Sequence, residues 1–294
     1  MRIVVIGASG QLGTDLMRSL GREEAIPLTH RDLDVCDHTA ARAALERSKP
    51  TVVINTAAYH RVDECEENVE RSFRVNAYAV RALAEICREL DAVLVHLSTD
   101  YVFGGERRLP YGEEDRPMPL NVYGVSKLAG EHLLQAAWHR HFIVRSSGLY
   151  GTAGASGKGG NFVETMLRLA REGKPIRVVD DQVLTPTFTK DLARKIRELI
   201  STEAYGLYHV TNEGECSWYE FARTIFELLG LTPDLAPTTT AAFGARARRP
   251  SYSVLRHGRL RALGLDDLRP WRDALQEYLR EKGYLGDEGA RHGL

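Results

Sequence analysis

The sequence predicts an α/β fold: a Rossmann-like, doubly wound parallel sheet with a smaller mixed α/β lobe in the C-terminal part. Short apolar runs rich in β-branched residues alternate with helical stretches, and they lie at 3–6, 25–29, 51–55, 92–97 and 142–146. These runs carry no antiparallel hairpin signal, so each helix is expected to cross over between parallel strands. Beyond residue 150 the alternation gives way to a glycine-rich segment and a mixed pattern, which indicates a second lobe.

The composition excludes several classes of protein. The 294 residues can build a sizeable core, and 43% hydrophobic with 27% charged residues is ordinary for a soluble globular enzyme. A formal net charge of −1 gives no overall attraction to nucleic acid or to an anionic membrane. The four cysteines are scattered without a C-x-x-C pair, and the apolar start is too short to span a membrane. We therefore expect a cytoplasmic protein with reduced thiols, and neither nucleic acid nor a membrane as its partner.

Three glycines follow the first apolar run directly. Gly7, Gly10 and Gly13 are spaced G-x-x-G-x-x-G ahead of a helical stretch at 14–20. The first would allow a tight turn, the second the close approach of a pyrophosphate, and the third the packing of helix on strand. The free N–H groups at the helix start would then point at the phosphates. A glycine turn can also serve packing alone, but its place between an N-terminal strand and a helix favours a dinucleotide site.

The residues after the second run bear on the choice between NADPH and NADH. An acidic side chain about 20 residues beyond the glycines would bind the adenosine ribose of NAD, and Asp32 and Asp34 fall there. Arg31 is placed to bind a 2′-phosphate instead. Together, these acidic and basic side chains slightly favour NADPH as the cofactor and leave NADH open. Arg31 is also explained if it simply lies in a solvated loop.

Three features follow the third run. The small residues Ala57 and Ala58 would let a cofactor lie against the strand ends. The charged segment 61–67 is most simply the solvated face of a helix. Asn76 lies within a helical stretch at 73–90, where an asparagine is unfavourable unless it faces solvent or bonds a buried group.

Hydroxyl groups gather after the fourth run and at the start of the next helix. The fourth run ends in Ser98, Thr99 and Asp100, where a sheet of this kind has its crevice. Tyr123 and Lys127 are four residues apart, so their side chains share one helix face. An ammonium beside a phenol lowers the phenol pKa, and the pair could pass a proton to a carbonyl oxygen while a hydride reaches the carbonyl carbon. A chance pair and a turn with capping hydroxyls would explain the same residues without catalysis. Beside the glycine turn we favour catalysis, with Thr99 bonding the carbonyl.

The chain beyond residue 150 predicts further helices and a returning strand. Segment 151–160 is glycine-rich and is expected to be a mobile loop, and the polar tail from Gly286 is expected to fray. A strand at 206–210 would rejoin the sheet, and helices are expected at 161–172, 190–200 and 217–229 and from His257 and Trp271. We assign 1–150 to a dinucleotide-binding domain, to which 188–212 returns, and 151–187 with 213–294 to a substrate-binding lobe.

An arginine cluster ends a loop-like stretch at 233–250. Arg246, Arg248 and Arg249 carry guanidinium groups, which suit a diphosphate because they can bind it through two parallel hydrogen bonds. A solvated loop explains the same cluster equally well. The sequence leaves both interpretations open.

Several of these motifs together resemble the dTDP-4-dehydrorhamnose reductases, a family of extended short-chain dehydrogenase/reductases. The matching segments are Gly7-x-x-Gly10-Gln-Leu-Gly13, Ser98-Thr-Asp-Tyr-Val-Phe103, Pro119-Leu-Asn-Val-Tyr-Gly124-x-Ser-Lys127, Asp181-Gln182 with Pro186-Thr187, Gly206-Leu-Tyr-His209 and Ala247-Arg-Arg-Pro250. The resemblance runs from Met1 to about Tyr284. It implies that NADPH or NADH reduces the 4-keto group of dTDP-4-dehydro-β-L-rhamnose to give dTDP-L-rhamnose.

The resemblance also implies roles for individual residues. Tyr123 would be the proton donor, Lys127 its partner and a ligand of the nicotinamide ribose, and Thr99 the hydroxyl that tunes the phenol. The implied cofactor contacts are Gly10, Gln11, Leu12, Asp34, Val35, Ala57, Ala58, Tyr59 and Leu97, with Asn76 as the helical asparagine that supports the active site. The implied substrate contacts are Thr99 and Asp100, to which we add Tyr123, Gly148 and Arg248 as candidates. Some members use Mg²⁺ at a dimer contact; the sequence shows no convincing ligand cluster, so no metal is expected, and a homodimer is an option.

One departure concerns the sugar. Family members often carry a tryptophan that packs on the substrate where this chain has Ser147-Gly148-Leu149-Tyr150. Losing an indole removes a large apolar contact. Either Leu149 or Tyr150 compensates, or the pocket takes another dTDP-4-keto-6-deoxy sugar. The same superfamily also contains nucleotide-sugar epimerases and dehydratases, and the same fold occurs in a non-catalytic protein, the regulatory β subunit of methionine adenosyltransferase. The sequence is compatible with these activities as well.

Overall fold

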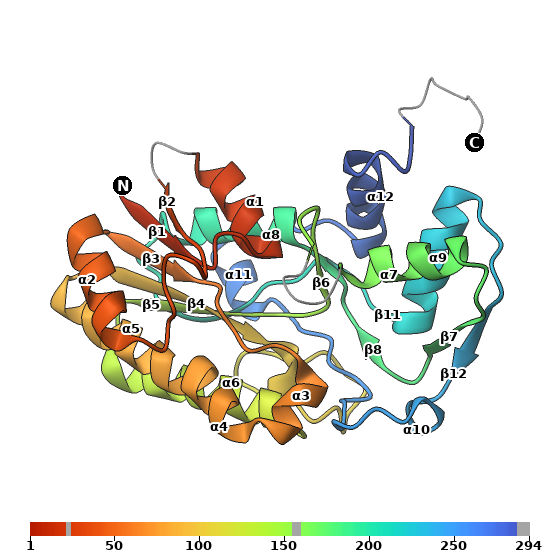
Figure 1. Ribbon diagram of the computed structural model, residues 1–294, viewed down its shortest axis with the longest axis horizontal. Helices are drawn as coiled ribbons and strands as arrows, with labels where there is room; N and C mark the ends of the chain where they lie inside the picture. The colour runs from red at the N-terminus through yellow and green to blue at the C-terminus, as the bar shows by residue number, and fades with distance from the viewer. Residues whose placement is uncertain (22–24, 155–159, 287–294) are drawn as a thin grey trace.

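The computed structural model describes residues 1–21, 25–154 and 160–286 of the chain. A six-stranded parallel sheet forms one half of the molecule, and a smaller lobe lies beside it (Figure 1). The strand order is β10-β5-β4-β3-β1-β2, with bounds β1 Ile3–Ile6, β2 Ala25–Leu28, β3 Val52–Asn55, β4 Val93–Thr99, β5 His141–Ser146 and β10 Gly206–His209. Pro27 is tolerated in β2 because this strand is the edge of the sheet. The predicted fold class is confirmed, and the chain reverses its direction of travel across the sheet between β1 and β3.

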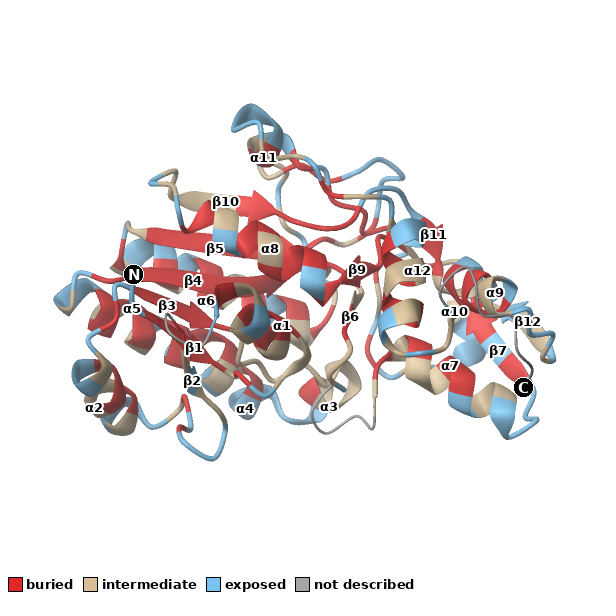
Figure 2. Ribbon diagram, turned by 90° about the horizontal axis from the view of Figure 1, so that it is seen from above, coloured by how far each residue is buried: buried red, intermediate tan, exposed pale blue. Residues whose placement is uncertain are grey.

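Helices cover both faces of this sheet, and its strands are buried almost throughout (Figure 2). One face packs on α1 (Gln11–Leu20) and α8 (Thr189–Leu199), and the other on α2 (His38–Ser48), α5 (Ala79–Glu89) and α6 (Val122–Ala137). The strands alternate sides, since Ile3 and Val5 join the α1/α8 cluster while Val4 and Ile6 join the opposite one. Both faces of the sheet are therefore covered by helices, so a binding site can form only at the ends of the strands.

The helical stretch expected at 73–90 has a looser turn at its start. It comprises α4 (Val69–Phe73), a π-helix (Arg74–Tyr78) and α5, and α3 (Val62–Glu67) precedes them. Asn76 lies in the π-helix, fully buried against α6. A Cβ on Gly130 of α6 would lie 2.1 Å from the Asn76 carbonyl oxygen. The two helices therefore approach more closely at this point than any side chain would allow.

The smaller lobe has its own core of aromatic and aliphatic side chains. Its elements are α7 (Phe162–Arg171), β7 (Ile176–Val179), β8 (Val183–Leu184), β11 (Cys216–Ser217), α9 (Trp218–Leu229), β12 (Leu235–Thr238), α10 (Thr240–Phe243) and α12 (Trp271–Glu281), with β6 (Leu149–Tyr150) and β9 (Thr187–Phe188) at its border with the sheet. A capping box at Ser217 and left-handed Gly230 delimit α9, as predicted. The prediction of a plain loop at 233–250 was wrong, because pairing with β7 turns part of it into β12 and a side-chain cap at Thr239 starts α10.

Residues 251–268 return to the large sheet, although they come from the part of the chain assigned to the second lobe. Leu255 forms a bridge with Tyr111, and α11 (Gly258–Ala262) packs at the β10 edge. Leu260 and Leu268 join the same core cluster as β1 and α1. The expected mobile loop at 151–160 and the polar tail fall partly outside the described residues, at 155–159 and 287–294. Within the described ranges, no helix combines the length and the apolar character needed to cross a membrane.

Candidate active site

The glycine turn between β1 and α1 has the geometry of a phosphate site. Gly7 has a φ of +81°, and a Cβ on Gly13 would lie 2.2 Å from the Gly7 carbonyl oxygen, so neither position accepts a side chain. Gly10 is the N-cap of α1 and offers no side-chain cap. The first N–H groups of the helix, those of Gln11, Leu12 and Gly13, therefore lack intrahelical acceptors. Such a helix start attracts a phosphate through its free donors and its dipole, so these residues fit the pyrophosphate of a dinucleotide.

The loop after β2 uses its acidic side chains to hold its own shape. An Asp32 oxygen accepts hydrogen bonds from the Thr29 backbone N–H at 2.8 Å and from the Thr29 hydroxyl at 2.6 Å, which together lower the Asp32 pKa. Asp34 accepts from the Cys36 N–H at 2.9 Å. Arg31 is exposed at the same loop, and Val35 is buried beneath it. The loop can therefore turn a guanidinium toward a cofactor phosphate while its carboxylates stay engaged.

The segment after β3 is fixed to the π-helix by one amide. The Asn76 side chain accepts from the Tyr59 N–H at 2.9 Å and donates to the Tyr59 carbonyl at 3.0 Å and to the Ser126 hydroxyl at 3.0 Å. Of the two possibilities for Asn76, the structure shows a bond to buried groups. Since Asn76 is fully buried, it sets the distance between the Ala57–Tyr59 segment and α6 rather than reaching into a cleft.

Lys127 is buried under the sheet end with two polar partners. Its Nζ donates to the Leu97 carbonyl oxygen and lies 3.2 Å from His96 Nε2. Burial lowers the Lys127 pKa to about 8, while the charge of Glu131 acts in the opposite direction. Burial and the Lys127 charge hold the His96 pKa well below its usual value, so the imidazole stays neutral.

Tyr123 and Thr99 meet across the end of β4. Asn121 caps α6 by accepting from the Gly124 N–H at 2.8 Å, which sets Tyr123 in the first helical turn. The ring of Tyr123 stands edge-on to Tyr101 with centroids 6.0 Å apart. Burial raises the Tyr123 pKa, and the neighbouring Thr99 hydroxyl only partly opposes this shift. The expected lowering of this pKa by Lys127 was wrong for this structure, because desolvation dominates and the ammonium points to Leu97 and His96. The phenol is consequently protonated at neutral pH.

Sequence reasoning missed two hydroxyls that complete the same strand end. Ser147, just after β5, donates to Asp100 at 2.8 Å, and Ser253, from the returning segment, donates to the same Asp100 oxygen at 2.6 Å. Ser147 could have been suspected because it follows a strand next to β4. Ser253 gave no local signal, since it lies 153 positions away in the chain.

The segment in which family members often carry a tryptophan has Gly148 in this chain, and this position has no room for a side chain. Gly148 has a φ of +54°, and a Cβ there would lie 2.8 Å from the Leu184 side chain and 3.1 Å from Pro186 Cα. Tyr150 is buried in the core of the smaller lobe, stacked on Phe188 with ring centroids 5.6 Å apart. Leu149 packs against the core of the large sheet. Of the three alternatives for the missing indole, compensation by Tyr150 is the one that this packing disfavours, because the ring is used in the core.

The charged segment 61–67 is not simply a solvated face. Asp63 accepts from Arg249 at 2.7 Å and from the Ala247 N–H at 2.9 Å, and Arg246 pairs with Glu67. Glu66 accepts from the Val122 N–H at 2.8 Å, at the start of α6.

The arginine cluster is accordingly divided between two kinds of role. Arg246 and Arg249 hold the loop to α3, so for them a freely solvated loop is excluded. The Arg248 carbonyl accepts from the Asn121 side chain at 2.8 Å, and Arg248 itself is exposed. Arg248 is therefore the member of the cluster left available for an anionic ligand.

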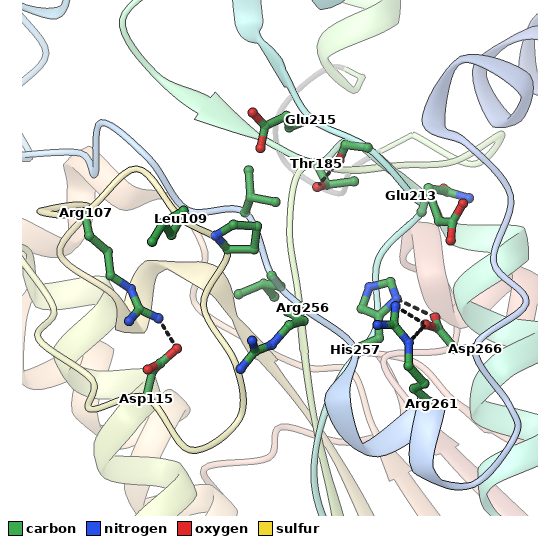
Figure 3. A pocket seen from close by; sticks show the side chains of 15 residues that line it. Arg107, Leu109, Asp115, Thr185, Glu213, Glu215, Arg256, His257, Arg261 and Asp266 are labelled. Carbon is green, nitrogen blue, oxygen red and sulfur yellow. Dashed lines mark hydrogen bonds and ion pairs between the residues drawn. The ribbon is translucent and has the colours of Figure 1, made fainter.

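A hollow of about 580 Å³ lies beside the site, and its lining includes Val254, the neighbour of Ser253 (Figure 3). None of the candidate site residues lines it. Its most notable group is His257, whose Nδ1 lies 2.8 Å from Asp266 and whose Nε2 accepts from the Thr211 N–H at 3.2 Å. The Thr211 hydroxyl lies 2.8 Å from His257 Nε2 and 2.9 Å from the Asn212 carbonyl oxygen. Because Thr211 is fully buried, this trio ties α11 to the sheet edge and exposes no nucleophile.

A metal site finds no support in the part of the chain that the structure describes. Across residues 1–21, 25–154 and 160–286, no three or more His, Cys, Asp or Glu side chains gather as ligands for an ion.

A glycine turn at the point where strand order reverses, with Thr99, Tyr123 and Lys127 at the ends of β4 and α6, defines an NAD(P)-dependent reductase of the short-chain dehydrogenase type. The family model for the RmlD substrate binding domain matches residues 1–283. The chain belongs to that family, the dTDP-4-dehydrorhamnose reductases, which confirms the resemblance and the oxidoreductase class.

Individual relatives agree with this assignment. The chain is 41% identical over 288 residues to the spore coat polysaccharide biosynthesis protein SpsK of Bacillus subtilis, covering 97% of this chain and 99% of that protein. It is 40% identical over 280 residues to a dTDP-4-keto-6-deoxy-D-glucose reductase of Streptomyces niveus, covering 94% and 96%. The crystal structure of dTDP-4-dehydrorhamnose reductase from Bacillus anthracis in complex with NADP superposes with a TM-score of 0.91 at 39% identity, covering 95% and 99%.

Proposed function

We propose that this chain uses NADPH to reduce the 4-keto group of dTDP-4-dehydro-β-L-rhamnose, giving dTDP-L-rhamnose. The observation that carries the proposal is that the Thr99 hydroxyl and the Tyr123 phenol are neighbours, one helical turn from buried Lys127. Such a set serves the reduction of a carbonyl, because a proton donor and a second polar group face one oxygen.

NADPH would supply a hydride with its electron pair from nicotinamide C4 to sugar C4. The chain's own groups do the rest. The start of α1 binds the pyrophosphate, Arg31 meets the 2′-phosphate, and Lys127 binds the nicotinamide ribose. Tyr123 gives its proton to the C4 oxygen as negative charge develops there, and the burial that keeps the phenol protonated suits this role.

On the substrate side, Thr99, Asp100, Tyr123 and Gly148 would surround the sugar, and Arg248 would bind the diphosphate. An exposed guanidinium on the loop that Asn121 contacts matches a diphosphate in charge and shape. The proposal leaves open whether the protein is a monomer or a homodimer, and light scattering would measure this.

A second candidate is the reduction of another dTDP-4-keto-6-deoxy sugar. Gly148 favours it, because the missing indole changes the apolar wall on which the hexose would pack. An epimerase or dehydratase would keep its cofactor without net oxidation, and a regulatory subunit would show no turnover at all.

The test is to follow NADPH and NADH absorbance with dTDP-4-dehydro-β-L-rhamnose and, separately, with its unepimerised 6-deoxy-D-xylo isomer. We expect steady NADPH oxidation with the first sugar, and a loss of about 10²- to 10⁴-fold in Tyr123→Phe, which removes the proton donor and keeps the ring. Faster turnover of the isomer would favour the second candidate. Catalysis without net oxidation, or equal rates for Tyr123→Phe and wild type, would contradict the proposal.

A further inference from the structure

Asp100 is a buried carboxyl group that accepts hydrogen bonds from three side-chain hydroxyls. Its side chain is 3% exposed, and it forms none of the ion pairs found among the described residues. One oxygen accepts from the Thr99 hydroxyl at 3.0 Å, and the other accepts from Ser147 at 2.8 Å and Ser253 at 2.6 Å. A buried carboxylate without a cation is costly, so its place beside the reacting groups calls for an explanation.

The single hydrogen of the Thr99 hydroxyl explains why Asp100 lies beside the reacting groups. A hydroxyl has a single hydrogen, and an ionised Asp100 can only accept, so it takes that hydrogen. The Thr99 oxygen then serves as an acceptor, and the Tyr101 N–H already donates to it at 3.2 Å. In this state Thr99 has no hydrogen to offer the reacting oxygen or the Tyr123 phenolate.

We propose that Asp100 is a positioning residue that sets the direction of the hydrogen bonds reaching the reacting oxygen. As a carboxylate it withdraws the Thr99 hydrogen, and as a carboxylic acid it donates to Thr99 and frees the Thr99 hydroxyl to donate into the site. The Asp100 proton is not transferred in either state, and the proton for the sugar oxygen still comes from Tyr123. This inference rests on the proposed ketoreductase function and adds a control on it.

The electrostatics of the cluster make both states accessible near neutral pH. Burial raises the Asp100 pKa to about 6, against the lowering effect of the Ser253, Ser147 and Thr99 hydroxyls. The titratable groups facing it are the phenols of Tyr101 on the following turn and Tyr123 on α6, and both remain protonated because burial and the Asp100 charge raise their pKa values. Asp100 is therefore the group of this cluster that changes charge around pH 6.

Asparagine is a close mimic of the protonated state. With its amide nitrogen toward Thr99 it donates there, and its oxygen accepts from Ser147 and Ser253, so every partner is satisfied in one orientation. Asp100→Asn should fold and should hold Thr99 permanently as a donor into the site.

The experiment is the pH dependence of kcat/KM for reduction of dTDP-4-dehydro-β-L-rhamnose by NADPH in five forms of the full chain. These are wild type, Asp100→Asn, Ser253→Ala, Ser147→Ala and the control Ser251→Ala, whose hydroxyl donates to the Gly105 carbonyl instead. Wild type should lose activity as the pH rises through about 6, and the pH profile of Asp100→Asn should lack that inflection, whatever its rate at acid pH. Ser253→Ala and Ser147→Ala should move the inflection upward by about half a unit to one unit, because each removes a bond that favours the carboxylate. Ser251→Ala should not move it.

Three results would overturn the inference: no wild-type inflection near pH 6, an unchanged inflection in Asp100→Asn, or serine variants that do not shift it. A purely structural role would lower the rate of Asp100→Asn equally at every pH, and thermal melting of each variant separates misfolding from this outcome. If wild type fails to oxidise NADPH with the keto sugar at any pH, the proposed function fails instead, so the two failures are distinguishable.

Discussion

Two buried carboxyl groups on or near α6 are held in opposite ways. Glu131, two turns beyond Tyr123 on α6, accepts from Arg145 at 2.9 and 2.6 Å, and both side chains are at most 3% exposed. Asp100, at the strand ends, accepts from three side-chain hydroxyls and is in none of the ion pairs of the described residues. The first is neutralised by a fixed cation and cross-links α6 to β5. The second is left free to gain or lose a proton beside Thr99, at the proposed site of reduction.

This difference distinguishes a carboxylate that stabilises the fold from a carboxyl group that can change its protonation state. A guanidinium fixes the charge of its carboxylate partner in two-point geometry, which suits the interior of the sheet. Hydroxyls can turn their hydrogens, so they accommodate both states of an acid, which suits a site where protons move. The same chemical change, acid to amide, should therefore have opposite effects at the two positions.

The largest expected effect is at the ion pair. Glu131→Gln leaves the Arg145 guanidinium buried without its counter-charge, so the free energy of unfolding should fall by about 3–5 kcal/mol. Urea unfolding at neutral pH measures it. A loss below about 1 kcal/mol would contradict the view that this pair is the support of the region.

The amide at position 100 should stabilise the protein at neutral pH instead. The Asp100 pKa is raised from 3.8 to about 6 in the folded chain, so the folded state favours the acid form. That contribution is complete below pH 3.8 and is lost as the pH rises through about 6. Asp100→Asn should thus equal wild type in stability near pH 4 and exceed it by up to about 3 kcal/mol at pH 8. Urea unfolding at both pH values checks this. Destabilisation at pH 8 that matches Glu131→Gln would remove the distinction between the two regions.

The smallest expected effect on stability is at the half-exposed ion pair between Asp63 and Arg249. Asp63 is 48% exposed in its pair with Arg249, so solvent screens the interaction. Asp63→Asn should lower the free energy of unfolding by no more than about 1 kcal/mol. The larger effect should be a rise in KM, because the loop that carries Arg248 loses a contact. Steady-state kinetics at two salt concentrations would measure it. A fall in kcat with KM unchanged would show that this pair acts on the chemistry rather than on binding.

The sequence predicted those parts of the fold and site that local patterns determine. The glycine turn, the strand ending at Thr99 and the Tyr123–Lys127 spacing each depend on a few neighbouring residues. The helix at 217–229 was predicted because its cap residues lie next to it. Periodicity also indicated the buried strands, and the six-stranded sheet contains all of them.

The errors came from contacts between distant parts of the chain. Asp63 and Arg249 are 186 positions apart, and Asp100 and Ser253 are 153 apart, so no local pattern marks either pair. The burial of Tyr150 likewise depends on Phe188 and Tyr278, which arrive from other elements. The sign of the Tyr123 pKa shift required the three-dimensional burial of the phenol, which outweighs a charge one helical turn away.

The most direct measurement uses NADPH labelled with deuterium at the transferred C4 position. Wild-type protein and dTDP-4-dehydro-β-L-rhamnose should give a reduced dTDP-sugar with one deuterium at C4 for each NADPH oxidised, observed by NMR. Deuterium at another carbon, or a sugar product without label and without net NADPH oxidation, would contradict the assignment of this site as a C4 ketoreductase.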